Sequence, residues 1–182
     1  MKQIINIHYG NEIFPLKINN NVLRYELKPL PFEPVDDIPK EVLRALKNPI
    51  NSKKLCEIVK KGDKVVILAD DVTRLTPVKQ ILPYVLNEIN RGGVPDEDIL
   101  ILIALGTHRS MTPDEINQKF GEEVINRVEI INHNYQDVKN LKHYGTTRRG
   151  TDIWVNRLVV DADVRNEPAP TPTPFLKYVL ET

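Results

Sequence analysis

Apolar and polar residues alternate through the first part of this chain, and that spacing predicts β-structure. Residues 2–27 hold two alternating runs that flank a Gly10-Asn11 turn, which is the pattern of a β-hairpin. A third strand is predicted at 22–27, before a loop with three prolines at 28–38. The next apolar spacing is helical and predicts two short helices, over residues 39–47 and 51–60.

From residue 64 onward, apolar strands alternate with amphipathic helices. Strands are predicted at 64–69, 98–105, 128–132 and 151–160, and the run at 98–105 is continuously apolar, as in a strand buried on both faces. Helices are predicted where apolar residues recur every three or four positions, from Val78 to Ile89 and over residues 112–127.

Capping residues set the expected ends of these helices. Thr76 is expected to cap the first helix and Pro77 to occupy its first position, while Pro83 predicts a kink or a later start. Thr112 and Glu115 have the spacing of a capping box at the start of the second helical segment.

Strand, helix, strand, helix, strand is the order of a right-handed α/β fold. We therefore predict a single three-layer α/β domain over residues 1–165, with a mostly parallel sheet flanked by helices and an N-terminal β-hairpin. Residues 166–182 contain the run "EPAPTPTP" and are predicted to be a Pro-rich linker with a short C-terminal tail.

Composition narrows the class of protein. Lysine plus arginine number 25, as do aspartate plus glutamate, so no overall charge favours nucleic acid or a membrane as a partner. The single cysteine, Cys56, excludes an internal disulfide and fits a reducing compartment. The N-terminus lacks the apolar segment of a secretory signal, so a cytoplasmic location is expected.

Polar residues gather where three successive predicted strands end. The first strand leads into Asp70, Asp71, Thr73 and Arg74; the second leads into "GTHR", Gly106 to Arg109; the third leads into "NHN", with His133 at its centre. The carboxyl ends of parallel strands share one edge of a sheet, where open α/β folds bind ligands. We therefore expect one shared site.

The residue types suggest roles in such a site. Arg74 offers a planar fork for a carboxylate or phosphate, and His108 can transfer a proton near neutral pH. Asp71 can orient a histidine or a substrate hydroxyl, and Gly106 allows a sharp turn. The set suits a small hydroxy acid.

Structural explanations stand beside these roles. Asp70 or Asp71 can cap a turn, Arg109 can pair with a surface acid, and His133 can be a buried structural histidine. No P-loop or GxGxxG run is present, and the histidines lack a zinc spacing, so no metal ligand is predicted.

Four segments together resemble the N-terminal domain of the nickel-pincer lactate racemase family: "DDVTRLTP", "ALGTHRSMTPDEI", "NHN" and "GTTRRGTDIWVNRLVVDADV". The resemblance runs from about Lys64 to Val164. It implies an isomerase that racemises or epimerises 2-hydroxy acids such as lactate, with a nickel pincer nucleotide as hydride acceptor and two histidines as opposed bases.

Position by position, the resemblance implies that His108 is one catalytic base and Arg74 the ligand of the substrate carboxylate. Further substrate-binding positions are implied at Asp71, Thr73, Gly106 and Thr107, and possible ones at Asp70, Arg109 and His133.

The family pattern stops after Val164. The family continues there with a second histidine and the lysine that bears the cofactor, whereas this chain continues with "RNEPAPTPTPFLKYVLET". We expect a substrate-binding, base-carrying domain that binds no cofactor and is inactive as this incomplete chain. The alternatives are a non-catalytic small-anion binding module, or a structural partner of a separate chain. The tail and an exposed face of the domain are candidate surfaces for self-association or for that partner.

Overall fold

The computed structural model of the chain describes residues 2–27 and 33–166, which belong to two compact units. The first unit, Met1–Pro34, contains an antiparallel hairpin of β1 (Lys2–Tyr9) and β2 (Glu12–Asn19). The N-terminal hairpin predicted from the sequence is confirmed. The third strand predicted at 22–27 is wrong: the chain turns after β2 and continues irregularly, Val22, Tyr25 and Leu27 are exposed, and none of the described strands pairs with this segment.

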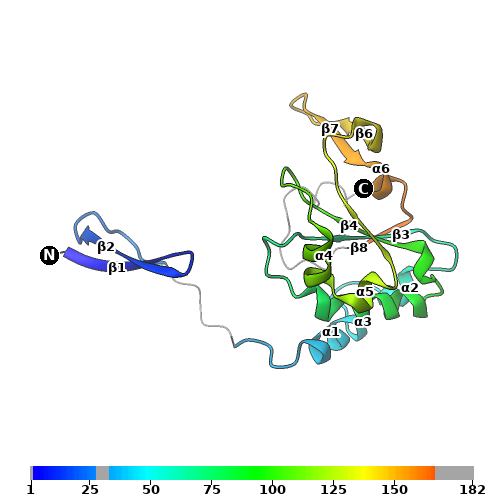
Figure 1. The fold of residues 1–182 in the computed structure, drawn as a ribbon, viewed down its shortest axis with the longest axis horizontal. Helices are drawn as coiled ribbons and strands as arrows, with labels where there is room; N and C mark the ends of the chain where they lie inside the picture. Colours follow the sequence, from blue (N-terminus) through cyan, green and yellow to red (C-terminus); the bar gives the residue numbers. More distant parts are fainter. Residues whose placement is uncertain (1, 28–32, 167–182) are drawn as a thin grey trace. The chain divides into compact units, whose positions relative to one another are not determined.

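The second unit, Val35–Thr182, is built on a four-stranded sheet (Figure 1). The strand order is β5-β4-β3-β8, and every pair is parallel. The strands are β3 (Val65–Ala69), β4 (Ile99–Ile103), β5 (Glu129–Asn132) and β8 (Val164–Asn166). The α/β fold class is therefore confirmed.

Five helices lie along one face of this sheet (Figure 1). They are α1 (Ile38–Lys47), α2 (Leu55–Ile58), α3 (Val78–Arg91), α4 (Pro113–Phe120) and α5 (Glu122–Ile125). Alternate residues of β3 and β4 face them, and the larger core cluster forms where Ile67 and Ile101 pack with Leu82, Leu86 and Phe120, all inaccessible to solvent.

The other face of the sheet carries a smaller layer. It comprises the short helix η2 (Val138–Asn140), the antiparallel pair β6 (Leu141–Thr146) and β7 (Asp152–Asn156), and α6 (Arg157–Val160). The intervening residues of the strands, Val66, Leu68 and Leu102, pack with Val159 and Ala162. Both faces are thus covered, which explains why β3 is buried along its whole length.

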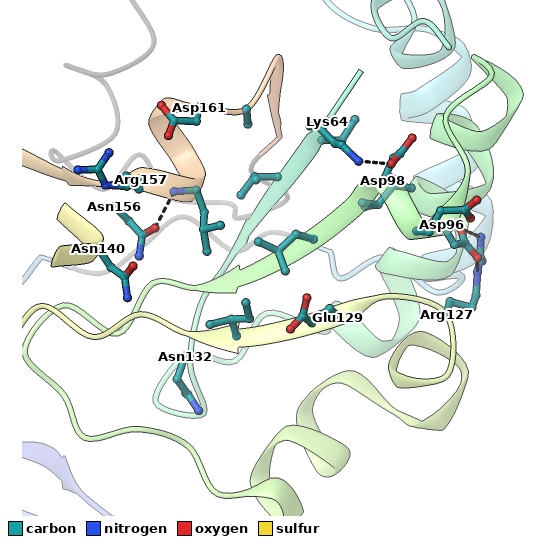
Figure 2. A pocket seen from close by; sticks show the side chains of 18 of the residues that line it. Lys64, Asp96, Asp98, Arg127, Glu129, Asn132, Asn140, Asn156, Arg157 and Asp161 are labelled. Atoms are coloured by element: carbon teal, nitrogen blue, oxygen red, sulfur yellow. Dashed lines mark hydrogen bonds and ion pairs between the residues drawn. The ribbon is translucent and has the colours of Figure 1, made fainter. Parts of the chain in front are cut away.

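A cavity of about 710 Å³ opens on this second face (Figure 2). Val66, Leu100 and Ile131 from the sheet line it together with Leu158 and Ala162. Its rim holds the ion pair between Lys64, at the amino end of β3, and Asp98, at the amino end of β4. Asp98 is the last residue of the short helix η1 (Asp96–Asp98), which leads into β4. The cavity extends to Asn132 and Asn134 at the carboxyl end of β5, but its lining does not include the residues that follow β3 and β4.

The fourth strand predicted at 151–160 is wrong as a member of the main sheet. Only Asp152–Asn156 is extended, and it pairs with β6. The side chain of Asn156 accepts a hydrogen bond from the Leu158 amide and caps α6, so the apolar run that follows is helical. The main sheet takes its fourth strand from β8 instead.

Helix ends also differ in part from expectation. α3 begins at Val78 with Pro83 inside it, so no later start occurs, and Pro77 is its N-cap residue. Thr76 does not cap α3, because its hydroxyl donates to Asp70. The capping box of Thr112 and Glu115 at α4 is confirmed. The helix predicted at 51–60 shortens to α2.

In the described ranges, no helix is both long enough and apolar enough to cross a membrane. The predicted linker and tail fall largely outside the described residues, as does residue 1.

Candidate functional site at the carboxyl edge of the sheet

The loop between β3 and α3 begins with a buried carboxylate. Asp71 is only 5% exposed, and its Oδ1 accepts hydrogen bonds from the Thr73 amide at 3.0 Å and the Thr73 hydroxyl at 2.5 Å. The backbone amide of Arg74 also donates to the carbonyl of Asp71, at 3.2 Å. This local turn fixes the Asp71 carboxylate and leaves its second oxygen for another partner.

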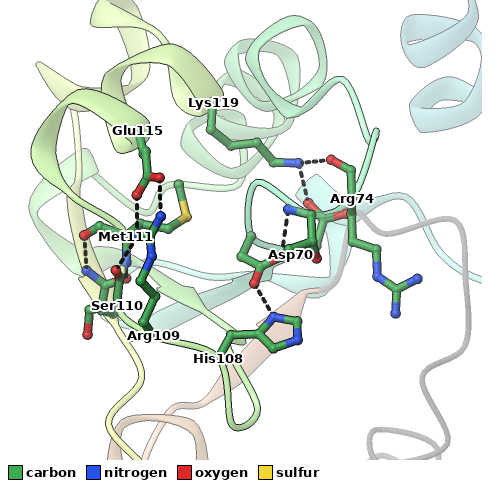
Figure 3. A network of polar contacts seen from close by, with 11 residues as sticks. Asp70, Arg74, His108, Arg109, Ser110, Met111, Glu115 and Lys119 are labelled. Carbon is green, nitrogen blue, oxygen red and sulfur yellow. Dashed lines mark hydrogen bonds and ion pairs between the residues drawn. The ribbon is translucent and has the colours of Figure 1, made fainter. Parts of the chain in front are cut away.

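That partner comes from the next strand. After β4 the chain turns at Gly106, whose φ of 59° is in the left-handed region that glycine adopts without strain. The amide of His108 closes the turn by donating to Leu105 at 3.0 Å. The His108 side chain then lies with Nδ1 2.6 Å from Asp71 Oδ2 (Figure 3). The two loops therefore meet as the parallel-sheet rule predicts.

The charge state of Asp71 decides how this pair works. Burial opposes ionisation, but the hydrogen bonds from the Thr73 hydroxyl, from His108 and from the Thr73 amide outweigh it and hold the pKa of Asp71 below its ordinary value. An ionised carboxylate only accepts hydrogen bonds, so Nδ1 of His108 must carry the proton. In the tautomer that carries this proton, the other ring nitrogen, Nε2, is a hydrogen-bond acceptor, on a side chain that is 57% exposed.

A buried lysine from α4 holds the other side of the β3–α3 loop. Lys119 Nζ lies 2.9 Å from Asp70 Oδ1, donates to the Arg74 carbonyl at 2.7 Å and reaches the Thr76 carbonyl at 3.3 Å (Figure 3). Asp70 also accepts from the hydroxyl of Thr76. Asp70 is thus part of the loop's support, in line with the structural explanation given for one of the two aspartates.

The side chain of Arg74 is exposed and points away from this support (Figure 3). Within residues 2–27 and 33–166, its guanidinium makes no ion pair or hydrogen bond. Arg74 is therefore a cation with its full donor set available, on the loop that carries Asp71.

The remaining predicted positions are placed less centrally. Thr107 is exposed next to His108. Arg109 binds both carboxylate oxygens of Glu115, at 2.8 and 2.6 Å, and this contact, with the hydrogen bond from the Thr112 amide, lowers the pKa of Glu115 to about 2. Arg109 is thus occupied by a surface acid.

His133, after β5, belongs to a different environment. Its Nδ1 lies 3.1 Å from the amide nitrogen of Asn156, and burial lowers the pKa of the half-buried ring. Asn156 is the last residue of β7 and the N-cap of α6, so His133 contacts these two elements and is not part of the Asp71–His108 pair.

Two supporting residues were not predicted. Asn132 holds the loop after His108, since its side chain accepts from the Met111 amide and donates to the Met111 carbonyl, both at 3.0 Å. The "NHN" run flagged this region, but it pointed to His133. Lys119 carried no sequence signal, because a lysine in the last turn of an amphipathic helix is ordinary.

The described residues do not fit a nickel site. No group of three or more His, Cys, Asp or Glu in the described part of the chain is arranged to hold a metal ion. Cys56, in α2, accepts a hydrogen bond from Arg91 at 3.6 Å, and the nearby Glu88 carboxylate together with burial raises the pKa of its thiol, which makes it a poor metal ligand.

The chain is thus an open α/β domain that carries a hydrogen-bonded Asp–His pair and an exposed arginine at the carboxyl edge of its sheet. Residues 9–165 match the family described as the lactate racemase N-terminal domain, and the chain belongs to this family. The recognition made from the sequence motifs is confirmed.

Full-length relatives share this region. Over 123 residues, which are 68% of this chain, it is 35% identical to the lactate racemase of Thermoanaerobacterium thermosaccharolyticum and 36% identical to that of Lactiplantibacillus plantarum. The match spans 29% of each relative's length.

Two solved structures have a fold similar to that of this chain. The lactate racemase apoprotein from T. thermosaccharolyticum superposes with a TM-score of 0.71 at 30% identity, over 91% of this chain and 38% of that one. A crystal structure of a Thermotoga maritima protein superposes with a TM-score of 0.53 at 24% identity, over 71% of this chain and 32% of that one, a likeness of fold alone.

Proposed function

We propose that this chain is the substrate-binding, base-carrying domain of a lactate-racemase-like isomerase that acts on a small 2-hydroxy acid such as lactate. The observation that carries the proposal is the 2.6 Å contact between Asp71 and His108, with Arg74 on the same loop as Asp71 and its guanidinium exposed and unpaired among the described residues. Membership of the family supports it, because the relatives are named lactate racemases.

In this proposal His108 is one of the two opposed bases. Asp71 keeps the Nδ1 proton in place, so Nε2 accepts the hydroxyl proton of one enantiomer and donates a proton to the same oxygen when that enantiomer is formed. The ionised Asp71 stabilises the imidazolium that exists in between, as the buried aspartate does in serine hydrolases. Asp71 therefore acts through His108, and Thr73 acts through Asp71.

Arg74 is proposed to bind the carboxylate of the acid. A guanidinium presents two parallel N–H groups to a carboxylate, which fixes both the charge and the orientation of the ligand. Gly106 and Thr107 are proposed to line the same site beside His108.

The hydride chemistry of the family is supplied by its nickel pincer nucleotide when bound. Because the described residues offer no ligand set for nickel, we propose that this chain binds none of that cofactor itself. A second chain or the remainder of a longer protein would then complete the site.

The first experiment separates a base-carrying domain from a plain anion module. ¹⁵N-labelled chain is titrated with L-lactate, D-lactate and propanoate, which lacks the hydroxyl. If His108 accepts a hydrogen bond from the substrate hydroxyl, lactate binds more tightly than propanoate. His108→Ala then removes that difference in affinity and leaves the affinity for propanoate unchanged. Equal affinities in the wild-type chain would instead support the non-catalytic anion module.

The second experiment concerns the chain by itself. With one lactate enantiomer, nickel and the pincer cofactor supplied, the optical purity is expected to stay constant. Formation of the opposite enantiomer at a rate proportional to protein would show that this chain is a complete catalyst.

A further inference from the structure

We infer that Lys119 is a positioning residue that shapes the β3–α3 loop and so aims Arg74 at the ligand. The inference rests on the proposed role of Arg74 as the carboxylate ligand and adds the device that sets its direction. Lys119 lies in α4, 45 residues beyond Arg74 in the chain, and is outside the Asp71–His108 pair.

The contacts of Lys119 are those of a loop anchor. Its side chain is 8% exposed, and the Asp70 side chain that it meets is 15% exposed. The ammonium group donates hydrogen bonds to the carbonyls of Arg74 and Thr76 and forms an ion pair with the Asp70 carboxylate, whose Oδ1 accepts no hydrogen bond in the described residues. Both hydrogen bonds of Lys119 are thus made to loop backbone.

The backbone contacts matter because they act at Arg74 itself. Holding the carbonyl of Arg74 on the α4 side leaves its side chain to project from the opposite side of the backbone (Figure 3). From the other end, the amide of Arg74 is held by Asp71. Arg74 is therefore fixed at both ends of its residue while its guanidinium stays free.

The ion pair between Lys119 and Asp70 would not by itself require the two hydrogen bonds from Lys119 to loop carbonyls. Buried ion pairs contribute little net stability, whereas removing one partner leaves an uncompensated charge that costs a great deal. Lys119→Met is therefore expected to destabilise the fold through Asp70 as well as to release the loop. The test must separate these two effects.

A double variant of the full chain, Lys119→Met with Asp70→Asn, separates the loss of stability from the release of the loop. The asparagine keeps an acceptor for Thr76 but carries no charge, so stability against urea recovers relative to Lys119→Met alone. The carbonyls of Arg74 and Thr76 still lack their donor. Lys47→Met, on the exposed end of α1, is the matched control.

We expect the double variant to bind L-lactate about tenfold more weakly than wild type, because a misdirected guanidinium loses part of its charge-assisted contact with the carboxylate. Its amide resonances over residues 72–76 are expected to shift and broaden, while the ring resonances of His108 stay in place. Lys47→Met is expected to match wild type in both measurements. Lactate affinity that recovers together with stability would overturn the inference and reduce Lys119 to a structural ion pair.

Arg74→Gln, measured in the same titration, tells the two failures apart. If Arg74→Gln weakens binding but the double variant does not, the role of Lys119 is wrong and the proposed function stands. If Arg74→Gln changes nothing, or wild type binds no lactate, the proposed function fails, and the inference that Lys119 aims Arg74 at a carboxylate fails with it.

Discussion

Two neighbouring strands of this sheet each end close to a histidine, and the two histidines are in opposite circumstances. His108, after β4, is exposed and bonded to a buried carboxylate. His133, after β5, is half-buried and bonded to the amide of Asn156. The partner and the degree of burial, rather than the place at the sheet edge, separate a candidate base from a structural residue.

The physical reason lies in what each environment does to a proton. A carboxylate beside the ring stabilises the charged form that a base must reach during catalysis. Burial without a charged partner disfavours that form, and the pKa of His133 is accordingly lowered. Four measurements test this difference between the two histidine sites.

The largest expected effect is on turnover. When this domain is joined to the rest of a full-length lactate racemase, His108→Ala is expected to lower the rate by about 10²–10⁴-fold in at least one direction, the usual share of a positioned base. His133→Ala is the control and is expected to leave most of the activity. Racemisation followed by chiral chromatography gives both rates, and similar losses for the two variants would abolish the distinction.

The next effect is on affinity. Arg74→Lys is expected to weaken lactate binding by about 1.5–3 kcal/mol, because an ammonium cannot reproduce a bidentate charge-assisted contact. Arg157→Lys is the matched control, since Arg157 lies beside Asn156 on the side of His133 and donates to the Lys139 carbonyl. Calorimetric titration measures both, and an unchanged affinity for Arg74→Lys would count against a carboxylate site beside His108.

A smaller effect is expected on stability. Asp71→Asn should destabilise the fold by about 1–3 kcal/mol near neutral pH, because it removes a charged acceptor from buried hydrogen bonds. The folded-state pKa of Asp71 is depressed, so this contribution is present above the unfolded-state value of about 3.9 and is lost as pH falls through the folded-state value. Urea unfolding at several pH values checks this, and a difference that persists in strong acid would contradict it.

The smallest effect concerns His133. Its folded-state pKa is lowered, so the unfolded chain takes up the proton first and the fold loses stability as pH drops below about 6.5. His133→Gln should remove that part of the pH dependence of stability, while its urea-unfolding midpoint at pH 7.5 stays close to that of wild type. An identical slope in both proteins would mean that the ring is not held in its neutral form.

The sequence was sufficient wherever local pattern and topology decide the outcome. β3 and β4 are continuous apolar runs, and the capping box at α4 depends on residues three positions apart. The meeting of Asp71 with His108 followed from the parallel arrangement alone, without knowledge of any contact.

What the sequence did not predict depends on distant partners. β8 is three residues long, and it is a strand only because β3 lies beside it. The run after Asn156 has the apolar composition of a strand, yet the cap on Leu158 makes it a helix. Lys119 has its role only because α4 brings it against a loop some 45 residues earlier.

The position of β8 also bears on how the domain acquires its fold. β3, α3 and β4 are contiguous in sequence and can assemble as soon as they leave the ribosome, but β8 pairs with β3 across about 99 residues, where the Lys64 amide donates to Asp163 at 2.9 Å. Contacts of such long separation form late, because the loop-closure entropy must be overcome before they stabilise anything. During synthesis the β3 edge therefore stays unpaired until Val164 has emerged, and the nascent domain exposes an apolar strand edge of the kind that chaperones protect.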